Sequence, residues 1–459
     1  MPRCSSLLAL LAAAALAREA AAADPPPAAP IDLTLYRDGD TYLRPTLALE
    51  SAIFAEHDAW HGESRSVLGD AVGYWWEWAF TGGLEGALAL GEFGSVFGRA
   101  SAIAARSQGL DAAGSNVDDR YAGDVEFDDA CLGWRSGELF PSLGHDALEL
   151  SVGKQKYQVG NGFLVLDGAS DGGERGAFWL APRKAFYMSA VARLTTGPYR
   201  AELFYLRPND HPFSGTDAVG GNFEYGAGET GTIGFTYLKV VGSQEASRAG
   251  LNLFDWRAAL TPLPIDRALS LGAEWALELN GSRSHAAAWY AEGGYTFEQS
   301  PWTPFVGYRY SQFGGDRPST AQSELWDPLF YGYNDWSTWY VGEIMGNFVA
   351  QNRDLRMQTV RLQVHPRDSV TAQLIYNYYA LLEPVSELAA RDENPRAANI
   401  HSHHLGQSFD LVTDWQPVSW LSFTGIVSAL DPGAGMRQYV ESDSRAWWLH
   451  FMLYAKVSF

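Results

Sequence analysis

The sequence contains little cysteine and few basic residues. Cys4 and Cys131 are its two cysteines among 459 residues, and Cys4 lies in a segment that we expect to be cleaved. The mature chain then has one cysteine and no intramolecular disulfide, so an exported protein must be stabilised in another way. Lys and Arg together number 33 against 54 Asp and Glu, a net charge of −21. This balance disfavours nucleic acid as a partner, because neutralising phosphates requires Lys and Arg.

Long hydrophobic runs are also missing after the first segment of the chain. Residues 7–16 (LLALLAAAAL) form an apolar stretch that is too short for a membrane-spanning helix. Arg3 precedes this stretch and Ala21-Ala22-Ala23 follows it, which is typical of a cleaved signal peptide over residues 1–23. A membrane anchor is the less favoured alternative. In every later apolar run, charged residues or glycines interrupt the stretch well before about 18 residues.

The chain does contain many aromatic residues, 14% of the total, and repeated alternation of apolar with polar residues. The clearest case is 268–279 (ALSLGAEWALEL), where Leu271 and Trp275 share one face while Glu274 and Glu278 share the other. Alternation with a period of two indicates a β-strand with two different faces. One such run does not distinguish a soluble all-β protein from a membrane barrel, so the number of runs is the deciding observation.

Eighteen runs of this kind can be identified after the signal peptide. They cover residues 46–54, 72–80, 84–103, 125–134, 148–157, 185–194, 200–207, 232–241, 251–260, 268–279, 287–297, 304–311, 339–348, 355–364, 370–380, 405–415, 421–429 and 447–459. Even strand numbers are the rule for bacterial single-chain barrels. We therefore predict an all-β fold, a transmembrane antiparallel β-barrel of about 18 strands, with 16 as an alternative. The barrel is expected over residues 43–459, after an N-terminal periplasmic segment at 24–42.

The last run supports a membrane location. Its alternation ends on Phe459, and a final strand with a terminal aromatic resembles the recognition signal that the barrel-assembly machinery reads on bacterial outer-membrane proteins. Only helices and closed barrels satisfy every backbone group in lipid, and helices are excluded above. Tyr and Trp near the strand ends suit the two interfacial girdles. A periplasmic or secreted all-β protein is the alternative.

The connections should alternate between short periplasmic turns and long outer loops. Gly82-Gly83 is interpreted as one of the short turns, and 158–184 as one of the long loops. The long stretch 312–335 does not fit, because counting from an inside N-terminus places it on the periplasmic side. Either a long periplasmic connection exists, or 339–348 is a loop and another strand has been miscounted.

The most distinctive sequence lies between residues 127 and 207. It contains FDDACLGWR, LELSVGKQKYQVGNGFLVLDG, FWLAPRKAFYMSAVARL and AELFYLRPND, followed later by YTFEQSPWTPFVGYRY, DPLFYGYNDWSTWYVGEI and a basic strand around Arg361. These segments resemble the alginate export family of outer-membrane barrel porins, most specifically at 152–162 and 181–193. The resemblance extends over most of the mature chain. It implies a monomeric barrel, often of eighteen strands, that conducts acidic polysaccharide or related solutes through a lumen lined with Arg and Lys. The family also has porin-like members, so the resemblance does not fix the solute.

Basic residues give this reading partial support. The candidates for lining the pore or binding substrate are Lys154, Arg183, Arg193, Arg200, Arg257, Arg309 and Arg361. Strand parity directs most of these side chains inward, and rings of Arg or Lys favour anions in a pore. Carboxylates such as Glu77, Glu202 and Glu274 are predicted to face inward too, so pairing of the arginines across the lumen is an equal alternative. Lys154 shares parity with Leu150, so it snorkels, lies above the apolar band or is displaced by a bulge.

Three other patterns are weaker. Asp118, Asp119 and Asp124 belong to an acidic loop that could bind Ca²⁺, but EF-hand spacing is missing and a solvated loop is the preferred interpretation. The histidines near 401–404 could bind a transition metal without a supporting cysteine. Residues 168–172 (GASDG) match G-x-S-x-G around Ser170, although Gly172-Gly173 is a poor helix start for a nucleophile elbow. We therefore expect no metal and no cofactor.

These observations predict a passive channel in the bacterial outer membrane, without enzymatic activity, for acidic polysaccharide, oligosaccharide or similar anionic solutes. A general diffusion porin without polysaccharide preference is the first alternative. A barrel hydrolase that uses Ser170 is the second. The expected partners are membrane lipid, an anionic glycan and the barrel-assembly machinery, and we expect a monomer.

Overall fold

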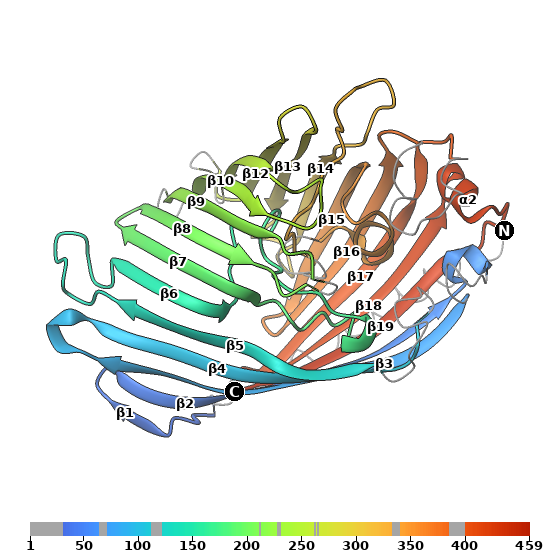
Figure 1. Ribbon diagram of the computed structural model, residues 1–459. Coiled ribbons are helices and arrows are strands. Elements are labelled where there is room, and N and C mark those ends of the chain that lie inside the picture. The colour runs from blue at the N-terminus through green and yellow to red at the C-terminus, as the bar shows by residue number, and fades with distance from the viewer. Residues whose placement is uncertain are drawn as a thin grey trace.

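The computed structural model describes residues 31–459 except 64–70, 112–121, 211–212, 227–230, 261–262, 264–265, 333–339 and 385–399. The predicted signal peptide, residues 1–23, lies outside the described residues. Within the described part, strands dominate, and every strand pairs with its neighbours in antiparallel orientation (Figure 1). The described helices are all too short or too polar to cross a membrane.

Eighteen strands form one closed barrel. The first half consists of β2 (Thr41–His57), β3 (Val72–Ala89), β4 (Ser95–Leu110), β5 (Gly123–Arg135), β6 (Leu148–Gln155), β7 (Phe186–Thr196), β8 (Tyr199–Arg207), β9 (Asp217–Gly226) and β10 (Thr232–Gly242). The second half consists of β11 (Asn252–Leu260), β12 (Leu269–Leu279), β13 (His285–Thr296), β14 (Phe305–Phe313), β15 (Leu355–Arg367), β16 (Val370–Leu381), β17 (His404–Val418), β18 (Leu421–Pro432) and β19 (Trp448–Ser458). This arrangement confirms the predicted fold class and the count of eighteen.

The barrel closes where the last strand meets the first long one. Strand β19 pairs with β2 from Leu449 opposite His57 to Ser458 opposite Ala48. A short additional strand, β1 (Tyr36–Asp38), folds back on the beginning of β2. Closure leaves no unpaired sheet edge along the paired length of the wall, as a lipid-embedded sheet requires.

The two faces of the wall follow the predicted alternation. On β12, Leu271 and Trp275 are exposed on the outer wall, whereas Glu274, Ala276 and Glu278 are buried toward the lumen. Aromatic residues predicted for the girdles, such as Tyr74 and Tyr308, are exposed on the outside. An apolar outer face therefore surrounds a lumen that holds most of the charged side chains of the strands.

Two errors in the predicted strands cancel in the count. Strand β9 was missed, because Gly220, Gly221 and Gly226 interrupt its alternation; a Cβ at Gly220 would lie 2.3 Å from the Tyr237 carbonyl oxygen on β10. The predicted strand at 339–348 is wrong, because Gly342–Ala350 forms the π-helical turn η5 instead. With β9 included, loop 314–354 joins the rim that carries the other long loops, which resolves the conflict over 312–335.

The predicted turn at Gly82-Gly83 is also wrong. Strand β3 runs through both glycines to Ala89, and the connection to β4 lies at 90–94 and includes the short 3-10 turn η2 (Gly91–Phe93). A Cβ at Gly83 would lie 2.5 Å from the Ala100 carbonyl oxygen on β4. Here glycine permits close approach of two strands, and the sequence pattern was misread as a turn.

The two rims of the barrel differ in their connections. One rim carries short links such as 197–198, 368–369 and 419–420, which we name the short-turn rim. The other, the long-loop rim, carries 58–71, 156–185, 314–354 and 433–447, with the short helices η1 (Ala59–Gly62), η3 (Gly173–Arg175) and α2 (Ala434–Val440). In outer-membrane barrels the short turns face the periplasm.

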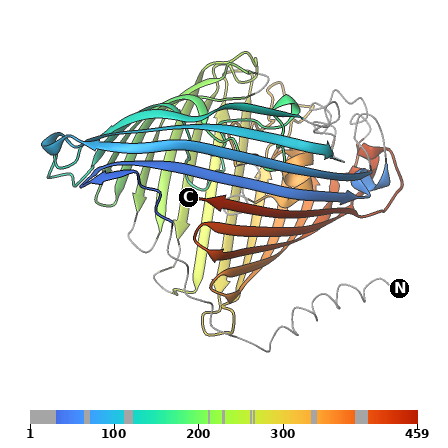
Figure 2. The same ribbon diagram turned by 90° about the horizontal axis from the view of Figure 1, so that it is seen from below.

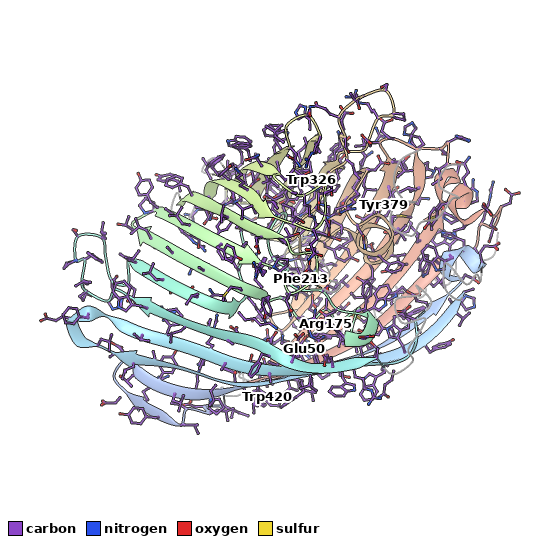
Figure 3. The ribbon with its side chains drawn as sticks, viewed as in Figure 1. Glu50, Arg175, Phe213, Trp326, Tyr379 and Trp420 are labelled. Atoms are coloured by element: carbon purple, nitrogen blue, oxygen red, sulfur yellow. The ribbon has the colours of Figure 1, made fainter. Side chains whose placement is uncertain are left out.

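Two of the long loops fold into the lumen and bond to each other. Leu166 N–H donates to the Phe330 carbonyl oxygen at 2.8 Å, and Gly332 N–H donates to Gly162 at 2.7 Å. Their apolar residues form a core inside the barrel: Trp326 lies 6.3 Å from the Phe163 ring, and the Tyr379 hydroxyl on the wall donates to the Val341 carbonyl (Trp326 and Tyr379 are labelled in Figure 3). The loops 156–185 and 314–354 therefore narrow the passage.

Candidate functional site

A row of five arginines lines the inner wall near the short-turn rim. Arg193 on β7, Arg200 on β8, Arg257 on β11, Arg309 on β14 and Arg361 on β15 all border internal cavities. We call these five residues the arginine row. Their strands are parts of one continuous wall from β7 to β15, so the five guanidinium groups lie on one side of the lumen.

Carboxylates on neighbouring strands hold the first two arginines in position. Arg193 pairs with Glu202 at 2.6 Å and Glu149 at 2.9 Å, and Arg200 pairs with Glu202 at 2.7 Å. The Arg193 and Arg200 side chains are 31% and 38% exposed, whereas the Glu202 side chain is fully buried. In the ion pairs of Arg193 and Arg200 with Glu202, the arginine is therefore the residue that faces the cavity.

Arg257 lies flat against the wall because a glycine is beside it. Its guanidinium bonds Asp255 at 2.9 Å and Glu224 at 2.7 Å. A Cβ built on the neighbouring Gly234 would come within 2.7 Å of that guanidinium. Loop 156–185 approaches the Arg257 side chain from the other side, at Gly160. The position and direction of the Arg257 side chain are thus fixed by β10 on one side and by loop 156–185 on the other.

The last two members of the row differ in their partners. Arg309 pairs with Glu292 at 2.8 Å, and its guanidinium carbon lies 5.4 Å from the Tyr290 ring centroid. Arg361 makes no hydrogen bond or ion pair with any of the described residues. Its charge is therefore the one in the row that no described carboxylate contacts directly.

The cavities along this wall are connected by shared residues. The larger has a volume of about 600 Å³ and is lined by Arg193, Arg200 and Arg257. The second has about 370 Å³ and is lined by Arg309 and Arg361. Asn161 of loop 156–185 and Tyr290 of β13 border both, so the two cavities are adjacent.

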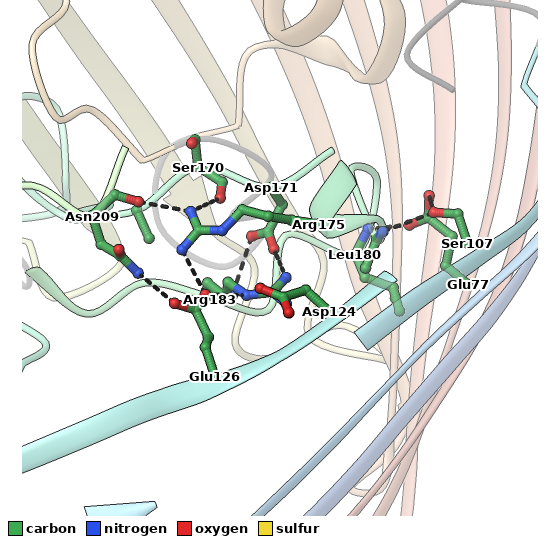
Figure 4. A network of polar contacts seen from close by, with 12 residues as sticks. Glu77, Ser107, Asp124, Glu126, Ser170, Asp171, Arg175, Leu180, Arg183 and Asn209 are labelled. Carbon is green, nitrogen blue, oxygen red and sulfur yellow. Dashed lines mark hydrogen bonds and ion pairs between the residues drawn. The ribbon is translucent and has the colours of Figure 1, made fainter. Parts of the chain in front are cut away.

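The other two basic candidates, Arg183 and Lys154, lie elsewhere. Arg183 is buried and pairs with Asp171 at 2.5 Å and Glu126 at 2.6 Å (Figure 4). Lys154 reaches the same Glu126 at 3.3 Å, and the β6–β7 register shifts next to it, between Gly153 and Gln155. Of the three arrangements considered for Lys154, a bulge is the one found.

This buried cluster fastens loop 156–185 to the wall. Arg175 pairs with Glu126 at 2.5 Å and donates to the backbone oxygens of Ser170 at 2.7 Å and Asn209 at 2.8 Å (Figure 4). Burial raises the pKa of Asp171 to about 7, and the adjacent Arg183 opposes that rise. We call Glu126, Asp171, Arg175 and Arg183 the loop anchor.

A second attachment of the same loop uses Glu77 on β3. Its carboxylate accepts hydrogen bonds from the backbone N–H groups of Trp179 at 3.0 Å and Leu180 at 2.9 Å, and from the Ser107 hydroxyl at 3.0 Å (Figure 4). Glu77 is fully buried. An inward carboxylate that the sequence places in the lumen thus serves to hold backbone.

Comparison with known proteins identifies the family. The sequence profile described as "Alginate export" matches residues 138–449. This range covers more than half of the chain. The chain belongs to the alginate export family.

Solved structures share the fold of this alginate export family member. Acinetobacter baumannii OccAB4 aligns with a TM-score of 0.56 and 12% identity over 90% of this chain and 97% of its own. Pseudomonas aeruginosa OccK5 (OpdH) aligns with a TM-score of 0.55 and 10% identity over 90% and 97%, and Pseudomonas aeruginosa OpdQ with 0.55 and 12% over 91% and 98%. No curated protein sequence gives a significant match. The family and the fold are therefore those of a channel in the bacterial outer membrane.

The described residues among the remaining candidate sites of this alginate export family member do not form a metal-binding group. Asp118 and Asp119 lie outside the described residues, and Asp124 bonds the adjacent Val125 N–H. The described part of the chain brings no three His, Cys, Asp or Glu side chains together in a metal-binding group. His403 bonds the Leu381 carbonyl oxygen at 2.9 Å, and His404 stacks on Tyr378.

The surroundings of Ser170 differ from those of a nucleophile elbow. The segment before it makes isolated bridges, and the three-residue 3-10 turn Gly173–Arg175 follows it. A nucleophile elbow instead needs a strand followed by a helix. The Ser170 carbonyl accepts a hydrogen bond from Arg175, so this residue belongs with the attachment of the loop.

Sequence reasoning missed three basic residues that border a third cavity next to the row. Arg99, Arg135 and Lys156 line this cavity together with Arg193. Arg99 lies in the predicted run 84–103 and Arg135 directly follows the run 125–134, but the β4–β5 register shifts between Ala100 and Ala102. Parity counted from the outer end of β5 is therefore wrong at Arg135, because an extra residue in a bulge reverses it.

Proposed function

We propose that this protein is a passive, diffusive channel for anionic solutes, of which acidic polysaccharides and oligosaccharides are the favoured class. The observation that carries the proposal is the exposure of Arg193 and Arg200 over a buried carboxylate in the larger cavity, whereas in the Arg309–Glu292 pair the carboxylate is the more exposed member. Arg193 and Arg200 face the cavity while their partner Glu202 is buried. A passing solute therefore meets guanidinium groups first, and these favour carboxylate-bearing chains.

Pairing also explains how such a row permits passage. A guanidinium already bonded to a carboxylate binds a solute anion less tightly than an unpaired one would, because its charge is partly compensated. Conduction requires sites that attract a solute and release it again. Four paired arginines of the row, Arg193, Arg200, Arg257 and Arg309, meet this requirement better than one strong site. We therefore expect a flexible charged chain to move from one arginine to the next.

A general diffusion porin is the second candidate, and one observation favours it. Almost every described arginine of the row has a carboxylate within ion-pair distance, so the net charge along the wall is small. If compensation is complete, ions of either sign would pass. The two candidates differ in a measurable quantity, the ratio of anion to cation permeability.

The test is planar-bilayer recording of the purified protein under a salt gradient. We expect a reversal potential on the anion side, reduced by added salt because screening shortens the reach of the arginines. A short oligouronate should block the current at concentrations where a neutral oligosaccharide of equal length does not. If anions and cations are equally permeant and both sugars block equally, the general diffusion porin is the correct assignment.

The remaining partners are also part of the proposal. The exposed outer wall is expected to contact membrane lipid, and the strand β19 with the terminal Phe459 to be read by the barrel-assembly machinery. Phe459 pairs with Leu47 through two backbone hydrogen bonds of 2.8 and 3.2 Å. Replacing Phe459 with Ser should slow membrane insertion and leave the conductance of inserted molecules unchanged. We expect a monomer, because the barrel is closed by its own first and last strands.

A further inference from the structure

The barrel wall projects further on one side of the short-turn rim. Strand β19 ends where Ser458 faces Ala48, but β2 begins at Thr41. Seven residues at about 3.3 Å each extend the wall by about 23 Å along the strand direction. Strands β3 and β4 continue with β2 over this length, and Figure 2 shows β2 running well past the C-terminus. We call the part of the wall formed by β2–β5 near this rim the projecting wall.

The inner face of the projecting wall borders a cavity of about 390 Å³. Tyr42, Glu85, Arg99 and Arg135 line it from β2 to β5. Lys156, Tyr157 and Arg193 complete it from the side of the arginine row. The family profile begins at residue 138, so half of this lining comes from strands outside the matched segment. We call this cavity the mouth site.

The charges of the mouth site are arranged like those of Arg193 and Arg200. Arg99 lies 3.7 Å from Asp129, and Arg135 lies 2.8 Å from Glu149. Arg99 is 42% exposed against 13% for Asp129, and Arg135 is 36% exposed against 21% for Glu149. Again the guanidinium of each pair is the member that faces the cavity. Lys156 adds an exposed ammonium group.

An aromatic ring fixes the direction of Arg135. Its guanidinium carbon lies 4.2 Å above the centroid of the Phe97 ring on β4. Phe97 itself lies over Gly133, where a Cβ would come within 2.2 Å of the ring. Cation–π contact restrains the side chain without neutralising its charge. The mouth site is therefore a preformed basic site, not a set of freely moving side chains.

We propose that the mouth site captures an acidic oligosaccharide from the periplasmic side and delivers it to the arginine row. Arg193 belongs to both sites, so a sugar carboxylate can move from Arg135 to Arg193 without leaving the wall. Guanidinium groups bind carboxylates in this manner, with two parallel hydrogen bonds. This proposal rests on the proposed function, because it assumes an anionic glycan as cargo. It adds a separate binding site and a side on which binding begins.

The experiment compares block of single channels by a short oligouronate added to one side or the other. We expect the double variant Arg99→Gln/Arg135→Gln to lower the association rate of block about tenfold from the short-turn side, since charge steering contributes at least that much. From the long-loop side, the association rate should not change. The variant Arg99→Lys/Arg135→Lys keeps both charges and should retain most of the wild-type rate.

A matched control uses two exposed arginines on the opposite rim. Arg283→Gln/Arg317→Gln removes the same charge from the loops of the long-loop rim and should leave block from the short-turn side unchanged. Its effect on the other side also reports which way the protein has inserted. An unchanged rate in Arg99→Gln/Arg135→Gln, or an equal loss from both sides, overturns the mouth site alone. Absence of oligouronate block in the wild type overturns the proposed function, and the mouth site with it.

Discussion

The arginine row and the loop anchor contain the same residue types in opposite settings. In the row, Arg193 and Arg200 reach into a cavity of about 600 Å³ and cover a buried glutamate. In the anchor, Arg183 and Asp171 belong to loop 156–185 itself, and both side chains are buried where the loop meets the wall. The row lies on strands of the wall, whereas three of the four anchor residues lie on the loop that folds into the lumen. What separates the two sets is therefore the loop, which buries the anchor and leaves the row open.

This difference assigns the two sets different physical roles. A half-exposed pair in water contributes little to stability, so its energy is available for attracting a solute. A buried pair contributes little over an apolar replacement, but loss of one partner leaves an uncompensated charge at high cost. The anchor should therefore control the shape of the passage, and the row its selectivity. The first of the following experiments changes one set and uses the other as its control.

The largest effect is expected from Arg183→Met. This change leaves Asp171 buried without its cation and should destabilise the folded loop by about 3–5 kcal/mol. Hydrogen exchange of residues 170–183 should rise, and single-channel conductance should increase or fluctuate, because the loop narrows the passage. Reconstituted protein measured by mass spectrometry and bilayer recording provides both values.

Arg193→Met is the matched control for that change. It removes a half-exposed arginine, and Glu202 keeps Arg200 at 2.7 Å and the Asn222 amide at 2.9 Å. Stability should change by less than about 1 kcal/mol, while anion preference falls. Equal loop exchange in the two variants would contradict the distinction between anchor and row.

The second largest effect is expected from Glu77→Ala. The Trp179 and Leu180 N–H groups lose their acceptor in a buried place, at about 1–3 kcal/mol for each unsatisfied group. Limited proteolysis should then cut near residue 180, where the wild type resists. Glu149→Ala removes a glutamate that pairs with exposed arginines, and it should leave the proteolysis pattern unchanged. A resistant loop in Glu77→Ala would show that the apolar core alone holds it.

The sequence predicted the strands of the barrel wall well and the segments inside the barrel poorly, for physical reasons. Alternation such as that of β12 reports directly which face meets lipid, so the fold class could be derived, although the number eighteen came out right only because two errors cancel. Glycine carries two meanings that composition does not separate: at Gly83 and Gly220 it allows close strand contact, where a turn or a gap had been read. Segment 339–348 alternates like a strand, yet it lies inside the barrel, with residues 341–346 buried on all sides.

The candidate site was predictable in type and not in arrangement. Parity directed Arg193, Arg257, Arg309 and Arg361 inward, and each borders a cavity. The same rule could not distinguish Arg183, because its setting depends on how thirty residues of loop fold back over it. Nor could it place Arg135, since a bulge in β5 reverses the parity. Coverage by loops and local bulges are tertiary properties that a strand pattern does not encode.

A smaller effect is expected from changing single charges in the second cavity. Arg361 has no ion-pair partner among the described residues, so Arg361→Gln removes a positive charge and leaves no uncovered carboxylate. A unit charge about 8 Å from a passing ion in water contributes about 0.5 kcal/mol, a factor of about two for each ion sign. The permeability ratio measured from reversal potentials should therefore fall toward unity, with stability unchanged.

Glu292→Gln supplies the opposite change in the same cavity. It removes the carboxylate that pairs with Arg309 at 2.8 Å, so the anion preference should rise by a similar factor. Changes of the same sign in Arg361→Gln and Glu292→Gln would mean that cavity shape, not charge, sets the selectivity.

The smallest effect concerns acid and the loops of the long-loop rim. His61 lies in η1, between β2 and β3, and its Nδ1 bonds the Ala446 carbonyl oxygen at 2.9 Å. Burial lowers the pKa of His61 to about 4, and the Ala446 contact opposes this. A released His61 titrates near 6.5. Its contribution to loop docking is therefore complete above about pH 6.5 and is lost as the pH falls toward 4. Hydrogen exchange of 59–63 and 443–447, corrected for intrinsic rates, should rise in this interval. His61→Gln should abolish that acid dependence and leave the arginine row unaffected; an equal acid response in both proteins would assign it to other groups.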